Sequence, residues 1–193
     1  MKPPRLKLKK KGNDIETGKL LWSQNTEGIR FRSSPVVSIS GKLFSCSELK
    51  IFRLHAATGK IEKMIKTPFN LEVTSRPLVL EDKIIVSTAD AGIAAFDLNS
   101  GKLLWNFETG PALVYSSPYT QKEARTVETS LVLKGHLLLF GAMDGKFYAV
   151  NVNNGQCEWS TDLGGPILST VAISGGIVYV ADYGGNLYAY KCN

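Results

Sequence analysis

The sequence predicts an all-β protein in which one four-stranded antiparallel sheet is repeated about four times. A turn glycine recurs along the chain, and a polar pair ends 25 residues before it in three successive repeats. Short apolar runs alternate with turn residues, and 18 glycines and 8 prolines interrupt the 193 residues too often for long helices. The turn glycines are Gly18, Gly59, Gly101 and Gly155, and the polar pairs end at Ser34, Arg76, Ser130 and Thr170.

Residues 92–105, GIAAFDLNSGKLLW, show the repeated unit most clearly. An apolar run is followed by a turn at residues 99–101 and then by a second apolar run, which is typical of a β-hairpin. Gly101 suits a turn position with positive φ because it has no Cβ, and Asn99 and Ser100 can bond locally to the backbone. Variants of the unit occur at residues 14–22, 52–64 and 147–159.

Strands assigned by this pattern fall into four units, which we expect at about residues 33–67, 75–109, 128–163 and 168–192. The last unit has three strands, whereas residues 19–25 form an outer strand without the other strands of a unit. Four-stranded units of about 40 to 45 residues are typical of β-propeller blades. The sequence therefore predicts a propeller over residues 13–193, preceded by a basic disordered tail over residues 1–12.

The extra outer strand and the incomplete last unit are complementary, and they leave three arrangements open. The chain could be half of a larger ring, or a ring of four blades closed by pairing the N-terminal strand with the last blade. Alternatively, two chains could complete one eight-blade ring as a homodimer by exchanging residues 19–25. An open half-propeller would expose the apolar faces of its first and last blades, and the other two arrangements avoid this.

Large side chains recur at one position of the outer strands. Trp22, Trp105 and Trp159 each follow a turn glycine by four residues, and the first full unit has Lys63 there with Met64 next to it. A blade cannot bury both faces alone, so neighbouring blades stack. We therefore expect Trp22, Met64, Trp105 and Trp159 to contact the adjoining blade.

The net charge of +6 is concentrated in the first 12 residues, which contain six Lys or Arg side chains and no acid. The remainder is balanced and has no basic stripe, so we expect no nucleic-acid binding. The N-terminal segment has no apolar core of a signal peptide, and no stretch approaches a membrane span. Cys46, Cys157 and Cys192 lack CxxC spacing, which argues against a metal cluster or a disulfide scaffold.

Three motifs resemble the repeats of pyrroloquinoline-quinone-like (PQQ-like) propellers. They are DxxTGKxxW and its variant at residues 14–22 and 97–105, Ser33-Ser34-Pro35, and DGKFYA at residues 144–149. This family includes quinoprotein alcohol dehydrogenases and a cofactor-free periplasmic lipoprotein of the outer-membrane barrel assembly machinery. Similar propellers are appended to bacterial calcineurin-like phosphoesterases, and the segment around residues 115–128 resembles those most.

The resemblance implies that two sets of loops gather on one face and bind ligands there. One set joins each outer strand to the next inner strand, and the long connection at residues 110–128 belongs to it. We expect a partner or ligand to be bound by polar residues of this set. They are Arg30, Arg32, Glu72, Arg76, Tyr115, Tyr119, Lys122, Arg125 and Glu128.

Catalytic chemistry has little support in the sequence. Neither His55 nor His136 has a Ser or Cys partner at a recognisable spacing. Asp90, Asp144 and Asp182 precede glycines at similar blade positions, but this spacing is typical of turns rather than of metal ligands. We therefore predict no catalytic residue and no metal site within this chain.

The sequence thus favours a non-catalytic propeller that binds a protein or small ligand at its loop face and belongs to a larger exported bacterial protein. The family resemblance implies a periplasmic or otherwise exported location. One alternative is a fragment of a quinone- or metal-dependent oxidoreductase, which would bind pyrroloquinoline quinone with Ca²⁺. Another alternative is a regulatory domain of a phosphoesterase.

Overall fold

The computed structural model describes residues 9–25, 29–114 and 123–192, in which all regular structure is β-strand. The strands are β1 (Lys9–Asn13), β2 (Leu20–Asn25), β3 (Val36–Val37), β4 (Leu43–Ser47), β5 (Lys50–Leu54), β6 (Ile61–Lys66), β7 (Leu78–Val79), β8 (Lys83–Ser87), β9 (Ile93–Asp97), β10 (Leu103–Phe107), β11 (Val132–Lys134), β12 (Leu137–Gly141), β13 (Lys146–Asn151), β14 (Cys157–Asp162), β15 (Ala172–Ser174), β16 (Ile177–Ala181) and β17 (Leu187–Lys191).

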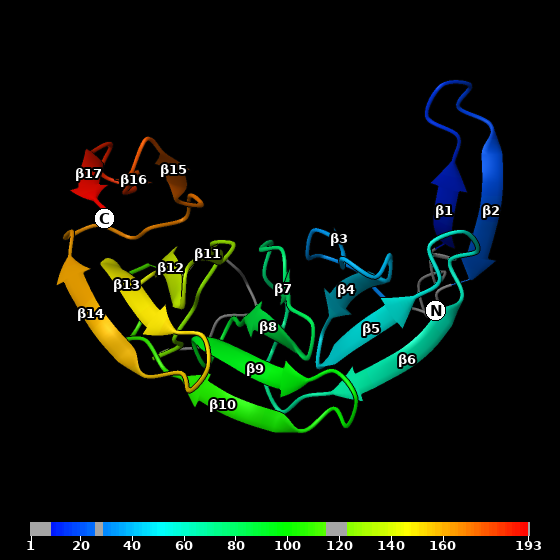
Figure 1. The fold of residues 1–193 in the computed structure, drawn as a ribbon, viewed down its shortest axis with the longest axis horizontal. Coiled ribbons are helices and arrows are strands. Elements are labelled where there is room, and N and C mark those ends of the chain that lie inside the picture. The colour runs from blue at the N-terminus through cyan, green and yellow to red at the C-terminus, as the bar shows by residue number, and fades with distance from the viewer. Residues whose placement is uncertain (1–8, 26–28, 115–122, 193) are drawn as a thin grey trace, which may run out of the picture.

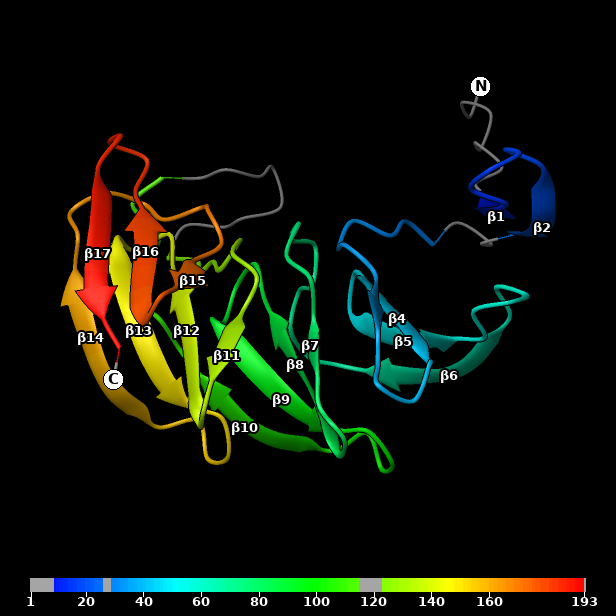
Figure 2. The same ribbon diagram turned by 45° about the horizontal axis from the view of Figure 1, so that its top comes forward.

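These strands form antiparallel sheets that follow one another as blades. The first blade (β3–β6), second blade (β7–β10) and third blade (β11–β14) have four strands each, and the last blade (β15–β17) has three. Figures 1 and 2 show the blades arranged in an open arc, with the last blade at one end and the hairpin β1–β2 at the other. The predicted all-β fold of four-stranded antiparallel blades is confirmed.

The N-terminal segment differs from its prediction in two respects. Residues 9–12 belong to β1 and pair with β2, so the segment expected as a disordered tail ends in a strand. In addition, β2 pairs with β1 and not with the last blade, so closure of a four-blade ring by its own N-terminal strand is not the arrangement found. A hairpin turn places β1 alongside β2, so the backbone of β2 forms its antiparallel hydrogen bonds with β1.

Most of the core lies between blades, because successive side chains of a strand point to opposite faces of the sheet. In β8, Ile84 and Val86 pack against the first blade, whereas Ile85 packs against the third. Similarly, Leu139 in β12 packs against the last blade and Phe140 against the second. The hydrophobic effect therefore holds each blade to its two neighbours, and an end blade has one face without that support.

The strands β2, β6 and β10 each place a large side chain on the turn glycine of the next blade. A Cβ atom built on Gly59 would lie 2.1 Å from Trp22 Cζ3, and one built on Gly155 would lie 2.7 Å from Trp105 Cδ2. Both glycines have positive φ, so the turn and the overlying ring each favour glycine. This contact explains why two landmarks recur together in the sequence. The tryptophan that follows one turn glycine by four residues packs on the turn glycine of the next blade.

The first blade makes this contact with Ile65, so the prediction for Met64 is wrong. Met64 pairs with Phe52 and is 44% exposed, whereas Ile65 pairs with Ile51, is 6% exposed and lies against Gly101 of the second blade. Alternation along β6 thus turns Ile65 toward the second blade and Met64 away from it. Lys63, which occupies the tryptophan position, donates hydrogen bonds to the carbonyls of Leu98 and Asn99 in the second blade.

The polar pairs connect the inner strands. The first residue of a pair bonds to the second strand of its own blade: Cys46 N donates to Ser33 Oγ (2.8 Å), Thr129 Oγ1 to Gly141 O (2.8 Å) and Ser169 Oγ to Ala181 O (3.0 Å). The second residue bonds to the next blade: Ser34 N donates to Thr74 O (3.4 Å), Arg76 N to Ser130 Oγ (2.9 Å) and Ser130 N to Thr170 Oγ1 (3.2 Å). Backbone groups near the propeller axis are satisfied in this way.

Asp97 begins the turn between β9 and β10. Its Oδ1 accepts hydrogen bonds from the backbone N of Ser100 (2.5 Å), from Ser100 Oγ (2.7 Å) and from the backbone N of Asn99 (3.0 Å). Hydrogen bonds from the backbone and the hydroxyl of Ser100 lower the pKa of the Asp97 carboxyl below its ordinary value. The carboxylate therefore stabilises the folded state at neutral pH, and this contribution is lost as the pH falls below about 4.

We expect Asp97→Asn to reduce the difference between the melting temperatures at pH 7 and pH 3, because the variant has no carboxylate to lose. Thermal unfolding followed by circular dichroism measures both temperatures. Asp82→Asn is the matched control, since the Asp82 side chain is exposed in a turn and its Oδ2 lies 3.6 Å from Nζ of its neighbour Lys83. Equal pH dependence in the two variants would contradict this role of Asp97.

Candidate functional site

Two sets of loops meet on one face of the arc. The connections from one blade to the next bond to the loops between second and third strands: Leu71 N donates to Glu48 O (2.7 Å), Ala89 N to Asn70 O (2.8 Å), Leu113 N to Met143 O (2.9 Å) and Tyr183 N to Pro166 O (2.8 Å). Backbone hydrogen bonds therefore link neighbouring loops on this face from the first blade to the last. A partner would meet a preformed surface there.

The predicted binding residues have different surroundings on this face. Arg30 and Arg76 are exposed, Arg32, Glu72 and Arg125 are half-buried, and Glu128 is buried. Tyr115, Tyr119 and Lys122 lie outside the described residues. The structure does not gather the described members into one cleft, because they extend over successive connections between blades.

Two of the predicted residues hold the long connection in place. Glu128 Oε2 accepts hydrogen bonds from the backbone N and Oγ1 of Thr74, both at 3.0 Å, and so joins two successive connections. Arg125 Nε lies 2.9 Å from Glu108 Oε2, and Arg125 O accepts a hydrogen bond from Gly92 N (2.7 Å). These contacts give Glu128 and Arg125 a positioning role within the loop face.

The carboxylate of Asp144 is committed to the backbone and to a buried tyrosine. Asp144 Oδ2 accepts hydrogen bonds from Gly110 N (2.7 Å) and the Tyr148 hydroxyl (2.5 Å), and its Oδ1 accepts one from Lys146 N (3.0 Å). Burial and the hydrogen bond to Asp144 raise the pKa of Tyr148 well above its ordinary value. The tyrosine therefore stays protonated and acts as a donor.

The carboxylates of Asp90 and Asp182 also accept hydrogen bonds from neighbouring groups. Asp90 accepts hydrogen bonds from Asn70 N at 3.1 Å, and burial raises the pKa of its carboxyl. Asp182 accepts hydrogen bonds from Asn186 N (2.9 Å) and the Tyr188 hydroxyl (3.1 Å). The hydrogen bond from the Asn186 side chain is the main cause that lowers the pKa of Asp182. Within the described ranges, no group of three or more His, Cys, Asp or Glu residues is placed to hold a metal ion.

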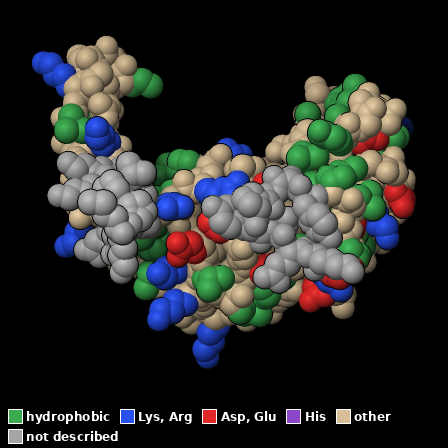
Figure 3. Space-filling view, turned by 180° about the vertical axis from the view of Figure 1, so that it is seen from behind, with side chains coloured by type: hydrophobic (Ala, Val, Ile, Leu, Met, Phe, Trp, Pro, Cys, Tyr) green, Lys and Arg blue, Asp and Glu red, His purple; other side chains and the backbone are tan. Residues whose placement is uncertain are grey.

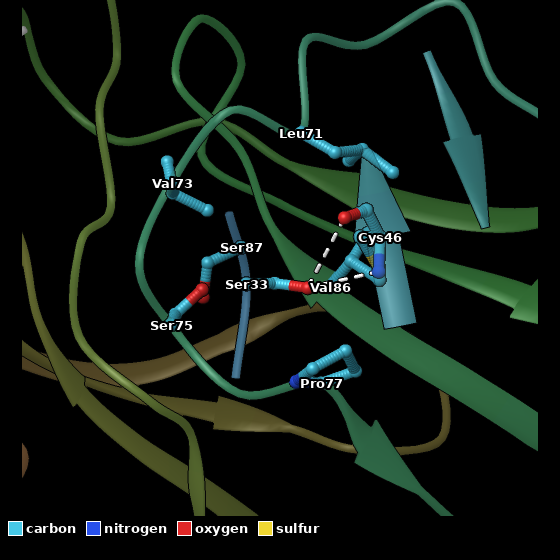
Figure 4. Close-up of a pocket in the computed structure, with 8 residues that line it drawn as sticks. All are labelled: Ser33, Cys46, Leu71, Val73, Ser75, Pro77, Val86 and Ser87. Carbon is cyan, nitrogen blue, oxygen red and sulfur yellow. Dashed lines mark hydrogen bonds between the residues drawn. The ribbon is translucent and has the colours of Figure 1, made fainter. Parts of the chain in front are cut away.

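A small hollow lies between the inner strands of the first and second blades, as Figure 4 shows. Its lining includes Ser33, Cys46, Leu71 and Val86, and it has no room for a bound molecule. Burial raises the pKa of the Cys46 thiol to about 12, so the reactive thiolate is disfavoured at neutral pH. The hollow is therefore a packing feature of the blade interface.

Two large side chains are exposed on the loop face. Leu113 is 56% exposed and Tyr183 is 75% exposed. A Cβ built on Gly145 would lie 3.1 Å from Leu113 Cδ1 and 3.4 Å from the backbone of Gly165, and one on Gly165 would lie 3.4 Å from Asp182 Cγ. Two glycines thus bridge Leu113 and the loop that carries Tyr183, and we call Leu113 and Tyr183 the apolar loop strip.

Sequence spacing gives little signal for this strip, because its two members are 70 residues apart and belong to different kinds of loop. The glycines between them resemble ordinary turn residues. On the face shown in Figure 3, basic and acidic side chains are interspersed. The described part of the chain contains no helix long and apolar enough to cross a membrane.

The chain is similar in sequence to the same protein from several bacteria. Outer membrane protein assembly factor BamB of Shewanella oneidensis is 27% identical over 131 residues, which are 62% of this chain and 31% of that protein. BamB of Bordetella pertussis is 22% identical over 161 residues, which are 79% of this chain and 36% of that protein. The chain therefore spans about a third of the length of these curated relatives.

Solved structures show the same fold. The crystal structure of BamB from Moraxella catarrhalis matches with a TM-score of 0.70 and 22% identity, over 90% of this chain and 50% of that one. The computationally designed Ika8 protein matches with a TM-score of 0.68 and 15% identity, over 93% of this chain and 51% of that one. The designed Ika4 protein matches with a TM-score of 0.66 and 14% identity, over 92% of this chain and all of that one.

The model of one protein family matches residues 11–156 and 120–192, which together include nearly the whole chain. That model is described as outer membrane protein assembly factor BamB. The match agrees with the PQQ-like repeat motifs and with the blades that they form. The chain therefore belongs to the PQQ-like β-propeller family of the outer membrane protein assembly factor BamB.

Proposed function

We propose that this chain is a non-catalytic protein-binding platform that acts in outer-membrane protein assembly as part of an exported bacterial protein. The observation that carries the proposal is the apolar loop strip on a hydrogen-bonded loop face. Leu113 and Tyr183 are exposed although the loops beneath them are held by backbone hydrogen bonds. Exposed aromatic and aliphatic side chains on a rigid face are typical of protein-binding sites.

The polar residues of the loop face support the same function. Asp144, Asp182 and Glu128 direct their carboxylates to backbone amides and hydroxyls of neighbouring loops. A Ca²⁺ site for pyrroloquinoline quinone needs carboxylate oxygens that are free to coordinate the ion, so these residues do not fit that cofactor. The likeness to phosphoesterase propellers stays a prediction.

The proposal predicts that altering the strip weakens binding to the assembly machinery. The double variant Leu113→Asp, Tyr183→Ala should lower the recovery of outer-membrane assembly proteins at least about tenfold, as expected when two hot-spot side chains are lost. The measurement is quantitative co-purification after cross-linking, from bacteria that express the tagged chain in place of their own factor. Leu104→Asp is the matched control, because Leu104 is 47% exposed on an outer strand.

Equal recovery with the double variant and the control would contradict binding at the strip. Failure of the unaltered chain to recover any assembly protein would contradict the wider function. A new absorption band after addition of pyrroloquinoline quinone and Ca²⁺, with alcohol-dependent dye reduction, would favour the oxidoreductase alternative.

A further inference from the structure

The turn between β13 and β14 differs from the equivalent turns in the residue that precedes its glycine. That residue is Thr17, Thr58 or Ser100 in the other turns, and it is Asn154 here. Each of the three hydroxyl groups accepts a hydrogen bond from the backbone N two residues later. Asn154 Oδ1 accepts the equivalent hydrogen bond from Gln156 N (3.0 Å). The carboxamide thus replaces the hydroxyl as part of the turn.

Asn154-Gly155 is the only Asn-Gly pair in the sequence, and such a pair has a chemistry that the hydroxyl residues lack. Glycine has no side chain, so its backbone nitrogen approaches the carboxamide of the preceding asparagine with little steric hindrance. The nitrogen of Gly155 loses its proton to a base and bonds to Asn154 Cγ, and the side-chain nitrogen leaves as ammonia. Water then opens the succinimide ring at either carbonyl and gives aspartate or isoaspartate. The sum of these steps consumes water and releases ammonia without oxidation or reduction.

The folded turn holds both reacting groups in hydrogen bonds. Gly155 N donates to Asn151 O (2.9 Å), so the nitrogen that would attack shares its proton with a carbonyl oxygen. Asn154 Nδ2 donates to Gln156 Oε1 (3.1 Å), and its Oδ1 accepts from Gln156 N. Asn154 is exposed, so water reaches its carboxamide. The hydrogen bonds, and not a lack of water, therefore oppose the reaction.

The second blade covers the attacking nitrogen. Gly155 is buried, and a Cβ atom built on it would lie 2.7 Å from Trp105 Cδ2. The peptide before Gly155 must rotate for its nitrogen to leave Asn151 O and turn toward the carboxamide, and the indole ring occupies the adjacent space. Trp105 belongs to the core between the second and third blades. The nitrogen is therefore released only when these two blades move apart at the turn.

We propose that Asn154 is a deamidation site that reacts when the second and third blades separate. In Figure 1 the turn between β13 and β14 lies beside the end of β10, the strand that carries Trp105. The reaction converts a transient separation of the blades into a permanent change of the chain. The turn follows β13 and the loop face precedes it, so the modified residue lies at the end of the blade away from the apolar loop strip.

The isoaspartate product changes the turn more than the aspartate product does. It carries the backbone through the side-chain carbon and so adds a methylene group to the main chain before Gly155. The hydrogen bonds Asn151 N to Gln156 O (2.8 Å) and Gly155 N to Asn151 O (2.9 Å) close rings of backbone atoms whose size depends on that segment. The lengthened turn no longer fits beneath Trp105. The second and third blades therefore pack less well after the reaction.

The rate of conversion of Asn154 gives the first test. The full 193-residue chain is incubated in mildly alkaline buffer, and peptide mapping by mass spectrometry follows the replacement of the amide by an acid. We expect Trp105→Ala to raise the rate at least about tenfold over the unaltered folded chain, because it uncovers the turn. Conversion of the unaltered chain at the same rate when folded and when unfolded in urea would overturn the proposal.

Phe96→Ala is the matched control for general loss of stability. Phe96 is 1% exposed and belongs to the core between the first and second blades, so its removal costs about as much as that of Trp105 at a different interface. We expect it to change the rate at Asn154 by less than about twofold. Circular dichroism checks that both variants are folded. Equal acceleration by the two variants would show that global unfolding exposes the turn, and would overturn gating by the second and third blades.

Gln156→Ala tests the site without altering the core. Gln156 is exposed, and this variant removes the acceptor of Asn154 Nδ2 while it keeps the backbone N. We expect a faster reaction with an unchanged melting temperature. Asn154→Ser places the residue of the second blade's turn here and should give no product at this position. The absence of conversion at Asn154 in both the unaltered chain and Gln156→Ala would overturn the site itself.

The stability of the products tests their effect on the blades. Ion-exchange chromatography separates the products from unreacted chain because each gains a negative charge, and tandem mass spectrometry distinguishes isoaspartate from aspartate. We expect the isoaspartate form to melt at a lower temperature than the unaltered chain. Asn154→Asp has the aspartate side chain on a normal backbone and should melt close to the unaltered chain. Equal melting temperatures for the isoaspartate form and Asn154→Asp would overturn the proposed effect on blade packing.

Discussion

Replacing Trp105 with alanine should lower the free energy of unfolding by about 3 to 5 kcal/mol, the usual loss for a buried aromatic side chain. Trp105 is 9% exposed, belongs to the core between the second and third blades, and covers Gly155 of the third blade. Its removal leaves a cavity at the blade interface and uncovers the turn. Urea unfolding followed by circular dichroism measures the change.

Trp159→Ala is the matched comparison, because Trp159 occupies the same repeat position and is 40% exposed. We expect this variant to lower the free energy of unfolding by about 1 kcal/mol, in proportion to the smaller area that Trp159 buries. A loss for Trp105→Ala no larger than for Trp159→Ala would contradict the view that these contacts stabilise the arc.

Replacing Asp144 with alanine should lower the free energy of unfolding by about 3 kcal/mol, because each buried group left without its hydrogen-bond partner costs about 1 to 3 kcal/mol. The Tyr148 hydroxyl and Gly110 N would both lose their acceptor. The double variant Asp144→Ala, Tyr148→Phe should recover part of the loss, since it removes one of the orphaned groups. The melting temperature measures both variants.

A Ca²⁺ titration distinguishes this role of Asp144 from metal binding. A structural carboxylate gives the same melting temperature with and without millimolar Ca²⁺ in the unaltered chain. A rise with Ca²⁺ that disappears in Asp144→Ala would show a cation site at this position. In that case the loop face would have a ligand chemistry beyond protein binding.

The hydrogen bonds of Asp144 bear on the proposed function because they hold the loop face together. Asp144 joins the connection after the second blade to the loop between β12 and β13, and Leu113 of the apolar loop strip lies in that connection. Removing the Asp144 carboxylate should therefore make the position of Leu113 less well fixed. A platform that recognises a protein partner depends on such preorganised loops, because ordering them at binding would reduce the affinity.

Sequence patterns predicted the blades because each landmark reports a local requirement. Gly101 and Gly155 have positive φ, which a residue without a Cβ adopts at little cost. Short apolar runs bounded by turn residues predicted the strands β8 and β13, and the resemblance to PQQ-like repeats predicted the family. None of these signals requires knowledge of which residues are neighbours across the fold.

The predictions that were wrong or missed depended on contacts between distant residues. Met64 and Ile65 are both apolar and adjacent, and only the pairing of β6 with β5 shows which of them faces the second blade. Residues 9–12 have the composition of a solvated tail, yet they pair with β2. Leu113 lies beside Gly145 of another loop, which no spacing in the sequence reveals.

The sequence by itself determined the repeat, the approximate positions of the blade strands and the turn positions, because backbone dihedral preferences and side-chain alternation act within a few residues. The tertiary structure alone decided which side chains are buried between blades and which carboxylates hold loops together. Those properties depend on the area removed from water and on hydrogen bonds between segments far apart in the chain. They arise only when the blades stack.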